Sequence, residues 1–260
     1  MADLARAERS SAEHSRFALL VASMSGTSID TIDPDLARSI LLTAPVGLAF
    51  ALRLAVTVLA LALGLLVSTN STNALASIAA LSSIALASLA WNGHGVATEG
   101  PLAWPHLIAD IVHLLAEGVW LGAITCLLYM VVRPKAAFAD LTTAQRCLKN
   151  FGSVGSMIVA LLLVTGVINR FAILGDQSLG SGIGATYIVL MVSKLALFTL
   201  MLALAALHRF RLVPAVERAT DHADKAMAIC RIRSSMVVEL AAAVVILGLV
   251  AWLGTLEPGW

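Results

Sequence analysis

Long apolar runs constrain this 260-residue chain more than any other feature. The strong runs cover roughly residues 43–68, 74–91, 105–132, 151–171, 185–208 and 235–254. A helix needs about 20 apolar residues to cross the hydrocarbon core of a bilayer, so each run predicts a transmembrane helix. Charged residues make up only 13% of the chain, against about 25% in soluble domains. The sequence therefore predicts an all-α polytopic transmembrane helix bundle.

A weaker apolar stretch from about residue 14 to 29 predicts a further span, which gives six to seven spans in all. We expect one membrane domain over 1–260, in which 1–42 is an N-terminal segment with this weak span and 43–258 is the helix bundle. No loop is long enough for a soluble catalytic domain, and we find no nucleophile–base pair or phosphate-binding glycine loop. We therefore expect a protein that is not an enzyme.

Loops with several Lys and Arg residues alternate with loops that have none, and this pattern predicts the orientation of the chain in the membrane. The loop 133–149 carries four Lys and Arg residues and the loop 209–233 carries six, whereas 92–104, 171–184 and the C-terminal tail carry none. Cytoplasmic loops are enriched in Lys and Arg, so the first two are expected inside and the C-terminus outside. The net charge of +1 says nothing about partners, but the sequence has no basic patch with interleaved aromatic residues, which argues against a nucleic-acid partner.

One apolar run carries a stripe of ionisable side chains, which we call the polar stripe: His106, Asp110, His113 and Glu117. Steps of four, three and four residues place all four on one face of a helix. Ionisable residues inside a membrane span usually face a cavity, a partner or an ion pathway. The polar stripe is therefore the first place to look for a function.

Histidines near the predicted outer surface suggest a metal site. His94 lies in the loop before the polar stripe, and His113 is about eight residues into its span. Neutral imidazole suits copper, zinc and iron, and carboxylates can complete a site. We take His94 and His113 as the best ligands, with His106, Asp110 and Glu117 as secondary ones. Alternatively, His106 is a solvated interfacial residue, His113 is a helix contact, and the acids only pair with cations.

Other polar or soft side chains within the spans suggest a pathway. Arg53 and Lys194 lie at a depth similar to that of Glu117, so we expect one of them to neutralise it, because an unpaired charge there is costly. Met157 and Met191 carry thioethers, which suit Cu(I). Single methionines are also common packing residues.

The order and spacing of these motifs resemble the copper resistance protein D (CopD) family of bacterial inner-membrane proteins. The resemblance covers roughly residues 20 to 258 and rests on these positions: Thr43-x-Pro45-x-Gly47, Arg53-Leu54, Gly93-His94, Asp110-x-x-His113, Trp120-x-Gly122, Thr165-Gly166, Tyr187, Lys194, Arg209, Pro214, Glu239 and Leu253-Gly254 with Pro258. The chain departs from the family pattern at Glu117, Ile188 and His208.

The resemblance implies copper as the bound ion, Glu239 as a further pathway residue, and a multi-pass protein of the bacterial inner membrane. We therefore expect copper binding and transport across the cytoplasmic membrane through an outer His and carboxylate site, in copper homeostasis or resistance. The expected partners are the copper ion, the lipid bilayer and a periplasmic copper-binding protein.

Two other functions remain open. The first is an electron-transfer subunit with b-type haem, which needs two deep histidines on facing helices. In this sequence only His113 is deep in a span, since His94 and His106 lie near the surface and His208 at the cytoplasmic end of its helix. The second is a structural or sensor subunit that moves no ion.

Overall fold

The structure is a computed structural model of the whole chain, and it describes residues 45–67, 71–92, 98, 100–132, 138–174, 185–218 and 222–254. These described residues are helical except for Val67, Ser71, Thr98 and Gly254, and there is no strand among them. The predicted weak span at 14–29 lies outside the described residues. The contacts divide the chain into two compact units, residues 1–92 and 93–260, and each is described on its own. The expected single membrane domain therefore stays a prediction.

The first unit is a helical hairpin, in which α3 (Pro45–Leu66) packs against α4 (Thr72–Ala87) and the 3₁₀ turn η2 (Ser88–Asn92). The Ser71 carbonyl accepts the first backbone bond of α4 from Leu75 N–H at 3.1 Å, and Ser71 itself is extended. Such a residue begins a helix without a helical conformation of its own. Ser71 thus marks the start of α4.

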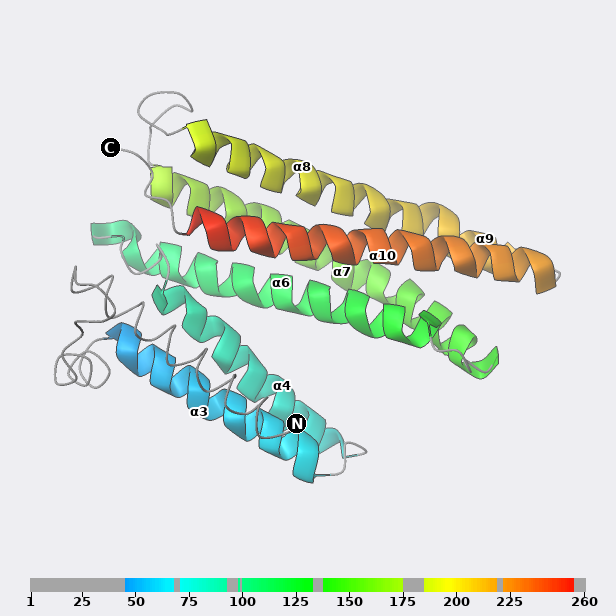
Figure 1. The fold of residues 1–260 in the computed structure, drawn as a ribbon, viewed down its shortest axis with the longest axis horizontal. Coiled ribbons are helices and arrows are strands. Elements are labelled where there is room, and N and C mark those ends of the chain that lie inside the picture. The colour runs from blue at the N-terminus through cyan, green and yellow to red at the C-terminus, as the bar shows by residue number, and fades with distance from the viewer. Residues whose placement is uncertain are drawn as a thin grey trace, which may run out of the picture. The chain divides into compact units, whose positions relative to one another are not determined.

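The second unit is built from four long helices, α6 (Ala103–Val132), α7 (Phe138–Leu174), α8 (Ala185–Leu207) and α10 (His222–Leu253). The 3₁₀ turn η3 (Gly100–Leu102) leads into α6, and Gly100 has φ +78°, a conformation that favours glycine. The π turn η4 (His208–Leu212) and the short α9 (Val213–Arg218) follow α8. Within this unit α10 lies between α6 and α8, and α7 packs against α6 (Figure 1).

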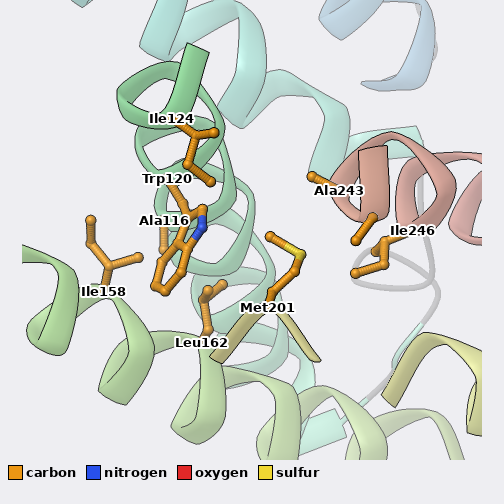
Figure 2. Packing of buried hydrophobic residues seen from close by; sticks show 9 residues of the cluster. Ala116, Trp120, Ile124, Ile158, Leu162, Met201, Ala243 and Ile246 are labelled. Atoms are coloured by element: carbon orange, nitrogen blue, oxygen red, sulfur yellow. The ribbon is translucent and has the colours of Figure 1, made fainter. Parts of the chain in front are cut away.

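The core of the second unit lies where α6, α7, α8 and α10 approach one another. Figure 2 shows the Trp120 ring among Ile158, Leu162 and Met201, with its ring nitrogen on the side away from Ile158. A second apolar cluster, nearer η4 and α9, contains Leu127, Leu212, Val216, Ala228, Ile232 and Met236. The small residues Ala116, Ala242 and Ala243 in the first cluster allow the helices to approach closely.

Six helical segments among the described residues are long and apolar enough to cross a membrane, which confirms the six strong spans. Large apolar side chains cover their outer surfaces; Leu65 is 85% exposed and Leu66 84%. In water such a surface would be unusual, but in a bilayer it faces lipid tails. The prediction of an all-α polytopic bundle is therefore confirmed, and the chain is a multi-pass membrane protein.

The helices extend beyond the predicted spans, and here the loop predictions were wrong. α7 begins at Phe138, so most of the expected basic loop 133–149 is helical. Helix also occupies most of the expected loop 209–233, as η4, α9 and the first turns of α10. Hydropathy marks the part of a helix that suits lipid, whereas the backbone bonds continue into water wherever no breaker intervenes.

Candidate metal and ion-pathway site

His113 lies at the contact between α6 and α7. Its Nδ1 atom is 2.8 Å from Oγ1 of Thr165 on α7. A Cβ at the neighbouring Gly166 would lie 3.7 Å from the imidazole Cε1, so the ring packs directly on the α7 backbone. The Thr165-Gly166 pair thus supplies both a hydrogen-bond partner and the space for the imidazole.

The hydrogen bonds of Thr165 favour one tautomer of His113. The Thr165 hydroxyl also lies 2.6 Å from the Leu161 carbonyl, and with its single proton donated there it accepts from His113. In this arrangement Nδ1 of His113 carries a proton. In neutral His113 this leaves the lone pair on Nε2, the nitrogen on the opposite side of the ring.

Glu117 lies one turn further along α6 and faces this lone pair. Its Oε1 atom is 3.2 Å from His113 Nε2, and its side chain is 30% exposed. Lys194 on α8 interacts electrostatically with Glu117. The expected pairing of these two charges stays a prediction. A lone pair and a carboxylate oxygen at this distance repel each other unless a proton or another cation lies between them.

The two outer members of the polar stripe have partners of their own. His106 is 1% exposed, and its Nδ1 atom lies 2.6 Å from Oγ1 of Thr98. It is therefore a buried residue and not the solvated one that the alternative interpretation assumed. Asp110 accepts a hydrogen bond from Asn169 Nδ2 at 3.3 Å. Asp110 and His113 thus face Asn169 and Thr165 on the same stretch of α7.

Glu239 lies below the polar stripe in the middle of α10 and is 2% exposed. Its Oε1 atom accepts a hydrogen bond from Trp120 Nε1 at 3.1 Å, and its Oε2 atom lies 3.4 Å from His208 Nδ1. Trp120 follows Glu117 by three residues, so it continues the same face of α6. A second polar cluster therefore adjoins the first.

The other predicted residues take no part in these contacts, or they lie outside the described residues. His94 lies outside the described residues, so its role as a ligand stays a prediction. In the first unit, Arg53 donates from Nε to Ser88 Oγ and from Nη2 to the Ser88 carbonyl, each at 2.9 Å. Met157 is 60% exposed, and Met191 packs beside Tyr187.

No group of three or more His, Cys, Asp or Glu side chains converges on one point within the described residues. Of the five predicted ligands, the described residues thus contain one close pair, His113 and Glu117. The sequence did not identify Thr165, Asn169 or His208 as partners of these residues. Thr165-Gly166 was visible only as a family motif, and Asn169 is an isolated amide in an apolar run.

Comparison with known proteins adds to this geometry. Residues 145–253 match the family model for copper resistance protein D, and residues 12–104 match that for the copper resistance protein D-like N-terminal domain. Copper resistance protein D of Pseudomonas syringae pv. tomato is 44% identical over 183 residues, covering 70% of this chain. The matched region spans 58% of the length of that relative. No solved structure matches the chain.

The family matches lie on both compact units and include the helices that carry Thr165, His208 and Glu239. They confirm the resemblance that the order of the sequence motifs indicated. The chain belongs to the copper resistance protein D family.

Proposed function

We propose that this protein binds copper ions within the bilayer at His113 and Glu117 and conducts them across the bacterial inner membrane. The observation that carries the proposal is the contact of His113 Nε2 with Glu117 Oε1 at 3.2 Å, on a histidine whose Nδ1 is held by Thr165. Its membership of a copper resistance family supports copper as the ion.

The His113–Glu117 pair offers a metal ion two ligand atoms. Metal–nitrogen and metal–oxygen bonds of about 2.0–2.1 Å at a tetrahedral angle place two ligand atoms about 3.3 Å apart. Metal-binding histidines usually donate their other ring N–H to an oxygen acceptor, which fixes the ring and raises its basicity. Thr165 provides such an acceptor on α7. With only two ligands from the pair, an ion is held loosely enough to move on, as conduction requires.

The polar stripe supplies a path to this pair. Asp110 lies about one turn above His113 on the same face of α6, and its carboxylate attracts cations. The Lys194 cation stabilises the negative charge of Glu117, so an arriving cation competes with the lysine for the carboxylate. We propose that this competition keeps the site selective for an ion that also binds imidazole.

The proposed orientation of the site in the membrane follows from the loop charges. The N-terminal end of α6 is placed outside, so the polar stripe begins at the outer surface and descends towards Glu117. A periplasmic copper-binding protein is the expected partner at this surface, and His94 would be the first ligand that an incoming ion meets.

The haem alternative gains no support from the described contacts. Haem between two helices needs two histidine nitrogens directed at one iron. His113 directs Nε2 at Glu117, one turn along α6, and Nδ1 at Thr165 on α7. His208 instead approaches Glu239 on α10.

The test is copper flux into vesicles that contain the purified protein in a known orientation. We expect the wild-type protein to raise copper entry above that of empty vesicles, and His113→Gln to return it to that level. Thr125→Val is the matched control, because this exposed hydroxyl on the same helix bonds to the Leu121 carbonyl of its own helix. Equal entry in wild-type and empty vesicles would contradict transport.

A further inference from the structure

The buried carboxyl group of Glu239 has no ion pair with Lys or Arg among the described residues. It contacts the neutral indole N–H of Trp120 at 3.1 Å and the imidazole Nδ1 of His208 at 3.4 Å. Burying a lone carboxylate inside a membrane protein is expensive, and such residues usually share a compensating charge or a proton. The state of His208 therefore decides whether Glu239 can be ionised at all.

His208 is itself incompletely satisfied. Its side chain is 7% exposed, and its Nε2 atom is buried without a hydrogen-bond partner among the described residues. It lies at the first residue of η4, a single π turn, and such turns occur often at functional sites. The hydroxyl of Ser235, one turn before Glu239 on α10, is also buried without a partner in the described part of the chain.

Two of the arginines on the elements packed against α10 have other partners. Arg209 donates to the Gly152 carbonyl and to Ser156 Oγ, each at 2.6 Å, and Arg218 donates to the Pro214 carbonyl at 3.1 Å. Arg211 is exposed on η4. On α6 the facing group is Trp120, which does not titrate. The net charge of the Glu239–His208 pair is thus set by whether it holds a proton.

With one proton the pair is neutral overall, either as a carboxylic acid beside imidazole or as a carboxylate beside imidazolium. Without the proton, the pair carries an uncompensated negative charge in the membrane interior. A cation arriving nearby would stabilise that proton-free state. The nearest proposed cation site is His113 and Glu117, and Glu117 lies one helical turn from Trp120, the indole that holds Glu239.

We propose that Glu239 and His208 form a proton-binding site whose proton is released as a copper ion enters the His113–Glu117 site. This inference rests on the proposed copper function and adds proton exchange to it. The proton leaves the pair, and the positive charge of the copper ion replaces it one turn away. Because coupling between two sites is reciprocal, a proton at the pair also weakens copper binding.

The experiment uses the full chain in vesicles loaded with a copper dye and a pH dye, with the membrane potential clamped. A copper gradient is imposed at equal pH on both sides. For the wild-type protein we expect copper entry with a rise of the lumenal pH, as protons leave. Glu239→Gln keeps an oxygen acceptor for Trp120 but cannot exchange a proton, so copper entry should fall about tenfold and the pH change should vanish.

His208→Gln is the second variant and should have the same two effects. Thr199→Val on α8 is the control, because its exposed hydroxyl bonds to the Leu195 carbonyl of its own helix. Equilibrium copper binding in detergent should persist in all three variants. Wild-type copper entry without a pH change would overturn the proton site and leave the proposed copper transport standing. No wild-type copper entry would overturn both, and loss of copper binding in Glu239→Gln and His208→Gln would make the pair a copper site instead.

Discussion

Nδ1 of His113 lies 2.8 Å from Oγ1 of Thr165, a contact that links α6 to α7. With Nδ1 held in this way, the other ring nitrogen, Nε2, faces Glu117. Because the Thr165 hydroxyl donates to the Leu161 carbonyl, it accepts the proton of Nδ1. The ring is thus oriented by a neutral partner, and its other nitrogen remains available to a proton or a metal ion.

Thr165→Val should lower copper affinity by about 10- to 100-fold, the usual loss when the partner that orients a ligating histidine is removed. The shape of the side chain is kept, so packing against α6 changes little. The measurement is competition for copper against a chelator of known affinity. Thr125→Val should leave the affinity unchanged, because no described ligand contacts that hydroxyl. Equal affinities of the two valine variants would show that Thr165 does not orient a ligand.

Glu117 and Lys194 should be energetically coupled. Removing only one of two interacting charges leaves the other uncompensated, so Glu117→Gln and Lys194→Gln should each destabilise the fold. A double-mutant cycle on unfolding in detergent should give a coupling of about 0.5–3 kcal/mol. The same cycle between Glu117→Gln and Thr199→Val should give none. A Glu117–Lys194 coupling within error of zero would remove the proposed competition for the carboxylate.

In the first unit, Ser88 should contribute to stability through Arg53. Ser88 is 3% exposed, and its hydroxyl accepts from Arg53 Nε while it donates to the Ala85 carbonyl. Ser88→Ala should destabilise the unit by roughly 1.5 kcal/mol, the lower range for a hydrogen bond to a charged group, since the bond to the Ser88 carbonyl remains.

The matched control for Ser88 is Ser83→Ala on the preceding helix α4, where an exposed hydroxyl bonds to the Ala79 carbonyl. This change should leave the melting temperature in detergent almost unaltered. A similar decrease in both alanine variants would mean that the Arg53 contact adds no stability.

Orientation can be tested with exposed thiols. Cys147 is exposed on α7, ahead of the span Phe151–Ile173, and the loop charges place it in the cytoplasm. With Cys126 and Cys230 replaced by Ser, a membrane-impermeant maleimide should label Cys147 only in inverted vesicles. With Cys147 also replaced by Ser, the variant Leu102→Cys, at a 60% exposed position of η3, should be labelled only in right-side-out vesicles. The opposite pattern would place the polar stripe at the cytoplasmic surface.

The sequence predicted the spans well because crossing a bilayer depends on length and hydropathy, which are properties of one segment. It also placed Asp110, His113 and Glu117 on one helix face, since the helical repeat alone determines this. It did not predict that Asn169 and Thr165 lie opposite them. Which helix faces the polar stripe depends on tertiary packing, and a single sequence does not record that.

The Glu239–His208 pair was missed for a related reason. The sequence places His208 at the cytoplasmic end of its helix and Glu239 early in the last span, but it does not show that the two side chains face each other. The π turn at His208 and the packing of α10 on α8 bring them within 3.4 Å. An isolated Glu in an apolar run does signal that a partner exists, but not which residue supplies it.

The most direct test of the account is equilibrium copper binding by the purified protein and by His113→Gln and Glu117→Gln, with Thr125→Val as the control. We expect the wild-type and control proteins to bind copper with the same affinity, and the copper affinity of each site variant to be at least about tenfold lower. Binding should also weaken as the pH falls, because protons compete with copper for imidazole. Unchanged copper affinity in both His113→Gln and Glu117→Gln would contradict the account.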